Sequence, residues 1–159
     1  NNLTIVDLEL NINLVSNLSV EKKILYYEDK IILSTAYYHN EMLHGPSIFY
    51  FKDGKVLSSV WFYEGKRYGK ACQYYASSKL YAINKYIADR FERQQIYYYE
   101  NGAVKTQINY KNGILDGEVK LFYESSIMKR ELFFKEGNNI FDNIYDEKGN
   151  KVDEKSFSL

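Results

Sequence analysis

Aromatic and apolar residues return along this chain every 24 residues, and this period organises most of the sequence. Two neighbouring aromatic columns start at Tyr26 and Tyr27, and a third starts at Tyr38. Glycines keep the same interval, because Gly45 and Gly69 lie one period apart. Columns that hold their register through five units predict a tandem repeat. They comprise Tyr26, Tyr50, Tyr74, Tyr98 and Phe122; Tyr27, Phe51, Tyr75, Tyr99 and Tyr123; and Tyr38, Phe62, Tyr86, Tyr110 and Phe134.

Each unit has the pattern of a β-hairpin. In the clearest copy, residues 96–99 and 104–110 are β-favouring runs, separated by a turn at 100–102 and followed by Asn112-Gly113. Asn-Gly between apolar runs is a strong hairpin signal, because both residues tolerate positive φ. No segment shows sustained helical periodicity. We therefore predict an all-β fold, an elongated antiparallel β-meander of about ten strands built from five to six tandem hairpins.

The chain is expected to form one domain over residues 1–159. Residues 1–21 would be an N-terminal strand or cap, residues 22–152 the tandem repeats, and residues 153–159 a tail. Leu8, Leu10, Ile12 and Leu14 are at strand spacing, so the first segment could fold over the early repeats.

The pattern Tyr-Tyr-x-x-Gly-x-Val, then Tyr-x-x-Gly-x-x-x-Gly, resembles the MORN repeat. It most resembles the bacterial variant, whose members are often described as antitoxins of toxin–antitoxin pairs. The resemblance covers about residues 22–152, with 41–45 and 112–117 in the family's loop position. Some positions depart from it: Lys30, Ser78 and Ser126 replace turn glycines, and Arg93 replaces an opening glycine. We therefore expect looser or differently shaped turns in the third unit, residues 70–93.

Alternation along a strand assigns the side chains to two faces. One face collects the Tyr26 and Tyr38 columns with two further apolar columns, and we predict that it is the core. Cys72 would then be a small buried hydrophobe and not a nucleophile. The two further columns are Ile24, Ile48, Cys72 and Ile96; and Ile32, Val56, Leu80, Val104 and Met128.

The other predicted face changes character along the chain. Its early half is aromatic and apolar, which suggests a partner-binding surface, a self-association surface, or a surface covered by residues 1–20. Its late half is basic, and its lysines would be solvated or form a basic face. The predicted partner-binding residues are Phe49, Phe51, Leu57, Trp61, Tyr63, Tyr75 and Tyr81, and the basic residues are Lys85, Lys105, Lys111, Lys129 and Lys135.

Charge and composition exclude several classes of protein. Lys and Arg number 21 and so do Asp and Glu, which argues against a free-standing nucleic-acid binder. One cysteine cannot form an intramolecular disulfide, and no apolar run approaches the ~18 residues of a membrane helix. The chain begins at Asn1 without Met, so a removed signal peptide or a trimmed boundary is expected. Both a bacterial cytoplasmic and an exported location stay open.

Catalytic chemistry finds little support. The sequence has no phosphate-binding loop and no Gly-x-Ser-x-Gly elbow. His39, Glu41 and His44 could suggest a metal site, but three close residues in one loop are a weak signal, and a turn role for His44 is favoured. We therefore expect no enzyme activity, no metal and no cofactor.

The favoured function is a repeat module that binds another protein, in line with the antitoxin-like resemblance. Attachment to a membrane surface or to lipid headgroups is the alternative, and carbohydrate binding through Trp61 is less favoured. Self-association through sheet edges is also open.

Overall fold

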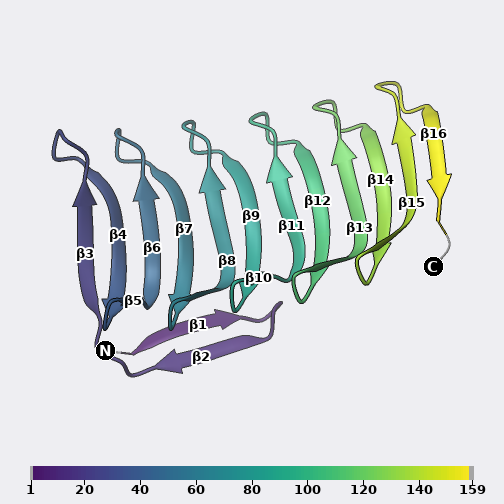
Figure 1. Cartoon of the computed structure of the whole chain (residues 1–159). Coiled ribbons are helices and arrows are strands. Elements are labelled where there is room, and N and C mark those ends of the chain that lie inside the picture. The colour runs from purple at the N-terminus through teal and green to yellow at the C-terminus, as the bar shows by residue number, and fades with distance from the viewer. Residues whose placement is uncertain (1, 158–159) are drawn as a thin grey trace.

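A computed structural model describes residues 2–157; residues 1, 158 and 159, at the ends of the predicted cap and tail, lie outside the described part. The fold is all-β, as predicted, with no helix among the described residues. Six hairpins stand side by side in one antiparallel sheet (Figure 1). Their strands are β3 (Glu21–Tyr26), β4 (Ile32–His39), β6 (Gly45–Tyr50), β7 (Val56–Tyr63), β8 (Lys66–Tyr74), β9 (Leu80–Ile87), β11 (Arg93–Tyr98), β12 (Val104–Lys111), β13 (Ile114–Phe122), β14 (Met128–Lys135), β15 (Asn138–Tyr145) and β16 (Lys151–Ser156).

Short strands and a separate hairpin complete the fold. β5 (Met42–Leu43) pairs with β4, and β10 (Arg90–Phe91) pairs with β9, so the sheet has 14 strands where about ten were expected. β1 (Leu3–Asp7) and β2 (Ile12–Ser16) form a two-stranded sheet of their own. Strand β16 begins before the predicted tail and includes most of it.

The turns at one end of the hairpins share one geometry even where glycine is absent. Gly54 and Gly102 have φ of 86° and 90°, and Ser78 at the equivalent position has φ of 68°. In each turn the N–H of this residue donates to the carbonyl three residues earlier, at 2.9 Å. The expectation of looser turns in the third unit is therefore wrong at Ser78, because its backbone hydrogen bonding holds a left-handed conformation that glycine adopts more readily.

Tyrosine hydroxyls join four of the repeats to the next one at this same end. The Tyr75 hydroxyl donates to the Tyr98 carbonyl at 2.7 Å, and the Tyr99 hydroxyl donates to the Phe122 carbonyl at 2.7 Å. Tyr27 and Tyr123 make the equivalent bonds at 2.7 and 2.9 Å. The Tyr27 column thus consists of inter-repeat hydrogen-bond donors, with Phe51 as its one member without a hydroxyl.

A β-bulge in the second strand of each hairpin changes which residues share a face. Phe49 pairs with Ser58 and Tyr50 pairs with Val56, so Leu57 is the extra residue. Beyond Leu57, alternation is shifted by one position, because a bulge places two residues opposite one. The prediction that the Tyr38 column shares a face with the Tyr26 column is therefore wrong, and the two columns lie on opposite faces.

We name the two faces by these features. The hairpin face carries Ile48, Val56 and Trp61, because Ile48 pairs with Ser59, two residues before Trp61. The bulge face carries Phe49, Leu57 and Phe62.

The predicted core columns lie in a single-layered sheet, so most of their side chains are only half-buried. No second layer covers the hairpin face along its whole length. The compact apolar cluster instead forms where β1–β2 meets the sheet. Ile5, Leu10 and Ile12 are buried there and pack with Leu14, Trp61, Tyr63, Tyr68 and Ile87.

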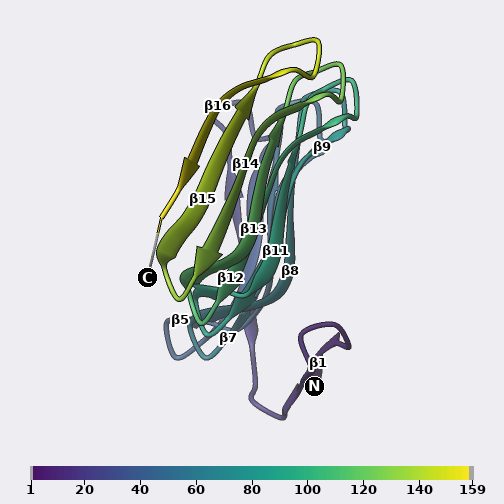
Figure 2. The same cartoon turned by 90° about the vertical axis from the view of Figure 1, so that its right-hand side faces the viewer.

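The β1–β2 hairpin lies at the lower end of the sheet and to one side of it (Figure 2). Glycines make room for β1: a Cβ on Gly45 would lie 3.3 Å from the Leu3 side chain, and one on Gly69 would lie 3.5 Å from the Ile5 side chain. Residues 3–16 therefore form a hairpin outside the repeat sheet, and this hairpin packs against the early repeats.

Candidate interaction surface

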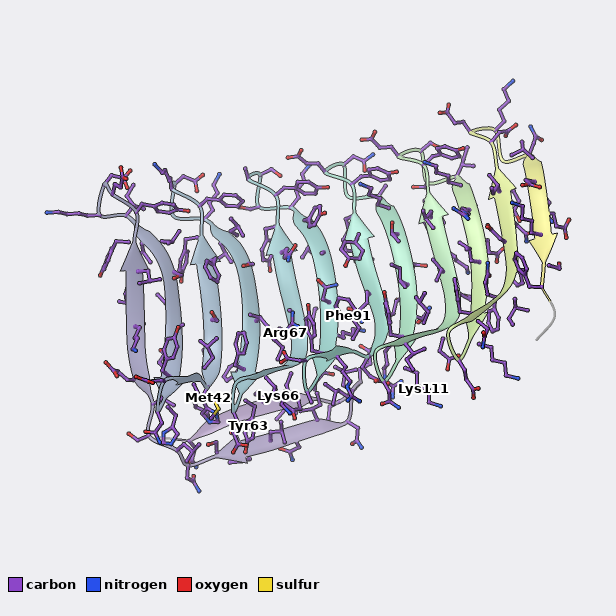
Figure 3. All side chains as sticks on the ribbon, in the orientation of Figure 1. Met42, Tyr63, Lys66, Arg67, Phe91 and Lys111 are labelled. Atoms are coloured by element: carbon purple, nitrogen blue, oxygen red, sulfur yellow. The ribbon has the colours of Figure 1, made fainter. Side chains whose placement is uncertain are left out.

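The β1–β2 hairpin covers two of the predicted partner-binding residues. Trp61 and Tyr63 lie on the hairpin face and pack against its apolar cluster. The Tyr63 hydroxyl donates to the Val15 carbonyl at 3.1 Å, and Tyr63 lies next to the hairpin (Figure 3). The aromatic ring of Tyr63 also lies 6.1 Å from that of Tyr68, centroid to centroid. These contacts account for the two residues as part of the internal packing of the chain.

The other five residues of the predicted set lie together on the bulge face. Phe49 and Tyr81 have 43% and 37% of their surface exposed. The ring of Tyr81 packs edge-on against Tyr75 at 5.2 Å and against Tyr97 at 6.2 Å. We call this surface the aromatic patch; it consists of Phe49, Phe51, Leu57, Tyr75 and Tyr81. Tyr97, which sequence reasoning did not select, borders it.

The bulge residue gives the bulge face its gradient along the sheet. Leu57 and Tyr81 hold the bulge position in the early repeats, and Lys105 and Lys129 hold it in the late repeats. Each late lysine lies over the ring of its own repeat, with Lys105 Nζ 5.5 Å from the centroid of Tyr99. The bulge position is therefore apolar in the early repeats and cationic in the fourth and fifth hairpins, and it is apolar again at Val152 in the last hairpin.

The five predicted lysines do not form one basic face. Lys105 and Lys129 lie on the bulge face, whereas Lys85, Lys111 and Lys135 follow the shifted alternation onto the hairpin face. The Lys85 side chain is largely buried and forms an ion pair with Glu9 at the tip of the β1–β2 hairpin. The bulge, which the sequence pattern does not reveal, separates the two groups.

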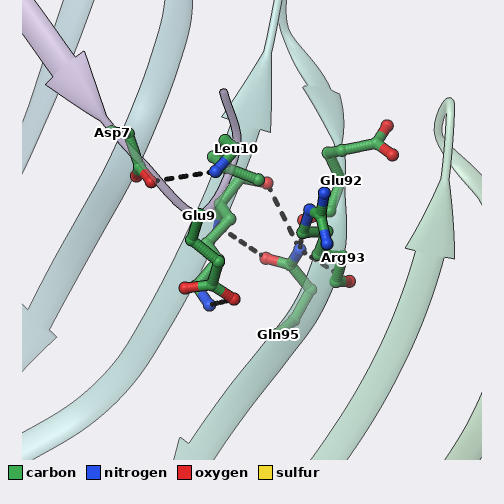
Figure 4. Close-up of polar contacts among 7 residues, drawn as sticks. Asp7, Glu9, Leu10, Glu92, Arg93 and Gln95 are labelled. Atoms are coloured by element: carbon green, nitrogen blue, oxygen red, sulfur yellow. Dashed lines mark hydrogen bonds and ion pairs between the residues drawn. The ribbon is translucent and has the colours of Figure 1, made fainter. Parts of the chain in front are cut away.

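A buried amide organises the sheet beside this ion pair. Gln95 is fully buried, and its Oε1 accepts from the Lys85 N–H at 2.8 Å. Its Nε2 donates to the Glu92 and Lys85 carbonyls at 3.1 and 3.2 Å (Figure 4). These bonds hold the backbone around Arg93, which has a φ of 59° where three other repeats have glycine. Sequence reasoning noted Arg93 as a departure but missed Gln95.

A hollow of about 590 Å³ opens next to the hairpin tip. Carboxylates and cations both line it, including Glu9, Glu92, Asp116 and Lys111. Glu9 is already paired with Lys85, and Glu92 accepts the Asn112 N–H at 2.8 Å. Glu9 and Glu92 thus have structural partners, and the hollow has no single sign of charge.

The two histidines serve the backbone of the turns. His44 is fully buried, and its Nδ1 accepts from the Glu64 N–H at 2.9 Å. His39 Nδ1 lies 2.7 Å from the Ser19 carbonyl oxygen. Burial lowers the pKa of His44 from its usual 6.5. Across residues 2–157, no group of three or more His, Cys, Asp or Glu side chains is placed to hold a metal ion.

Cys72 is a free, half-buried thiol in the Ile48 column, where it pairs with Ser59 and Ile83. The described residues include no helix that is long and apolar enough to cross a membrane.

The fold and its surface define the class: an open, single-layered sheet of tandem β-hairpin repeats that presents a continuous face. The MORN repeat variant family matches residues 94–112 and 115–136, which are strands β11 to β14 with their turns. Residues 94–136 are thus MORN-type repeats, and the same hairpin unit recurs on both sides of them. No curated protein matches the chain.

Proposed function

We propose that this chain is a non-catalytic repeat module that binds another protein through the aromatic patch. One observation carries the proposal. Phe49 and Tyr81 remain exposed at 43% and 37% on a face that the β1–β2 hairpin leaves free. Exposed aromatic side chains on one face are typical anchors of protein interfaces, because they bury a large area and lose little conformational entropy.

The gradient along the bulge face supports this position for the interface. A repeat that only had to fold would have no reason to change its bulge residue from leucine and tyrosine to lysine. Lysine at Lys105 and Lys129 keeps the late repeats solvated and discourages contact there. Outside the last hairpin, whose bulge residue is Val152, the apolar early repeats are therefore the part of this face that a partner would cover.

The MORN repeat family supports a module of this kind, because such repeats are typically non-catalytic. The resemblance to the bacterial variant suggests an antitoxin-like role, in which the bound protein would be a toxin encoded as its pair. We propose this antitoxin-like role as the specific form of the function, in which the toxin would bind to the aromatic patch.

Affinity capture from a bacterial lysate tests the proposal with matched variants. Phe49→Ala with Tyr81→Ala removes the two exposed rings, and Lys105→Ala with Lys129→Ala makes an equal truncation on the same face. We expect the first double variant to lose the captured protein by more than tenfold and the second to keep it. Equal capture by both folded variants would contradict the aromatic patch as the site.

Membrane attachment is the second candidate, and the division of the lysines between two faces gives it little support. Peripheral binding needs clustered cations near anionic lipid, at about 1 kcal/mol for each lysine. Sedimentation with vesicles of phosphatidylserine and phosphatidylcholine at low salt is expected to leave this chain in the supernatant.

A further inference from the structure

The two edge strands of the sheet carry different side chains. The upper half of β3 exposes Leu25 and Tyr26, with 59% and 56% of their surface accessible. Ile31 and Ile32, which follow in the adjoining turn and strand, are exposed too. At the other edge, β16 is mostly polar and charged (Lys151, Asp153, Glu154 and Lys155). Charged residues are the usual protection of an edge, because they oppose pairing with another strand. The upper half of β3 lacks this protection.

We propose that β3 pairs with β3 of a second copy of this chain, antiparallel, so that the two sheets become continuous across a twofold axis. This inference does not rest on the proposed function, since it concerns the edge of the sheet and not its faces. An antiparallel strand pair is self-complementary, and closed twofold dimers are the commonest symmetric assemblies.

Symmetry and charge restrict the register of this pairing. The twofold axis stands perpendicular to the sheet and therefore keeps each residue on its own face. Residues directly opposite each other must point to the same face, so the axis must pass through a pair that one residue forms with its own copy. An axis at Lys22 or Lys23 would bring two like charges together, which destabilises a cross-strand pair. An axis at Ile24 instead places Lys22 opposite Tyr26 and Lys23 opposite Leu25.

The register centred on Ile24 repeats a contact that the sheet already uses. Lysine ammonium groups lie over tyrosine rings at several places within the chain, such as Lys52 at 5.5 Å from the centroid of Tyr27 and Lys23 at 4.6 Å from that of Tyr38. Pairing Lys22 with Tyr26 of the second copy would bring the same groups together.

Head-to-tail pairing of β3 with β16 fits less well. In the β14–β15 pair, Leu132 lies opposite Asp142. Counting from the pairs next to the bulge, Lys155 of β16 has the position of Leu132, and Lys23 of β3 has the position of Asp142. Two ammonium groups would therefore face each other. In the turn of the last hairpin, Asp146 takes the place of the tyrosine that joins the internal repeats, so this end of the sheet lacks that hydroxyl donor. The edges favour a closed dimer over an open filament.

The dimer would arrange the two aromatic patches in a defined way. A twofold axis perpendicular to the sheet keeps both bulge faces on the same side. The early repeats of each copy lie next to the axis, so the two patches would be neighbours. A short strand pair buries a small area, so the dimer should be weak and should depend on concentration.

Sedimentation equilibrium of the wild-type chain from about 1 µM to 1 mM tests the dimer. We expect the mass to rise from 18.8 kDa towards about twice that value. The matched variants are Leu25→Lys and Val152→Lys, since Leu25 and Val152 are 59% and 60% exposed on opposite edges. Leu25→Lys places a new ammonium group opposite Lys23 and should shift the dissociation constant at least tenfold towards monomer. Val152→Lys should leave it unchanged.

Oxidative cross-linking gives a second readout that does not depend on the strength of the dimer. In a Cys72→Ala background, Ile24→Cys lies on the proposed axis and should form an intermolecular disulfide, whereas Val152→Cys should not. A wild-type chain that stays monomeric at 1 mM, masses above the dimer, or cross-linking only through Val152→Cys would each overturn the proposal.

Discussion

Removal of one tyrosine hydroxyl that joins two repeats tests how neighbouring repeats are held together. The Tyr99 hydroxyl donates to the Phe122 carbonyl at 2.7 Å, two strands away in the sheet. Tyr99→Phe deletes this bond and leaves the ring in place. A hydrogen bond that replaces hydration contributes about 0.5–1.5 kcal/mol, so we expect a loss of about 1 kcal/mol in the free energy of unfolding.

The chain offers the reverse experiment at Phe51. This residue holds the same column, where the acceptor would be the Tyr74 carbonyl. Phe51→Tyr should therefore raise the free energy of unfolding by about 1 kcal/mol, as much as Tyr99→Phe lowers it, because the ring is already at the position of the hydrogen-bonding tyrosines. A loss and a gain of equal size would identify the hydroxyl, and not the ring, as the origin of the effect.

Urea unfolding followed by circular dichroism measures both changes. A chain of this size has a slope of about 2 kcal/mol per molar urea, so each variant should shift the midpoint by about 0.5 M, in opposite directions. The slopes must stay equal for the shifts to report stability, since repeat proteins can lose cooperativity. Midpoint shifts below about 0.1 M for both variants would refute the reasoning, because the hydroxyls would then exchange their bonds with water at no net gain.

Three further predictions concern the turns and the β1–β2 hairpin. Burial lowers the pKa of His44 below its usual value of 6.5. The unfolded state therefore binds more protons than the folded state as the pH falls through 6.5, and the free energy of unfolding declines there. His44→Gln keeps an acceptor for the Glu64 N–H and should flatten that decline in urea midpoints measured from pH 7.5 to 5.5. Arg93→Gly relieves the strain of a φ of 59°, so it should raise the free energy of unfolding by about 1 kcal/mol and the thermal midpoint with it. A lower midpoint would show that the contacts of the arginine side chain outweigh the strain. Trp61→Ala leaves a cavity beneath β1–β2 and should cost about 3 kcal/mol or more in stability. It should therefore speed proteolysis of residues 2–20, whereas Phe49→Ala should not. Equal cleavage rates for the two variants would contradict the packing of Trp61 against the hairpin.

The sequence predicted the repeat, the hairpins and their turns, because the interactions that form them are local. Aromatic columns and glycines at a 24-residue interval are enough to place the strands, and the type of each turn follows from its own few residues. The expected core was less successful. Half-burial of the Ile24 and Tyr26 columns depends on whether another layer covers the sheet, and no local pattern reports that.

The candidate surface was predictable only as far as the bulge. Alternation along the strands assigned Phe49 and Tyr81 to the same face as Trp61, and the β-bulge separates them. A one-residue shift in register moves every later side chain to the other face, so a small irregularity decides the composition of both surfaces.

By itself, then, the sequence determined the class of structure: tandem hairpins in an antiparallel meander, with a change of character from early to late repeats. Only the tertiary structure decided which side chains face a partner. The β1–β2 hairpin takes Trp61 and Tyr63 for internal packing, the bulge leaves Phe49 and Tyr81 exposed, and Glu9 pairs with Lys85. The physical reason is that backbone pairing follows from nearby residues, whereas the covering of a face depends on contacts between segments far apart in the chain.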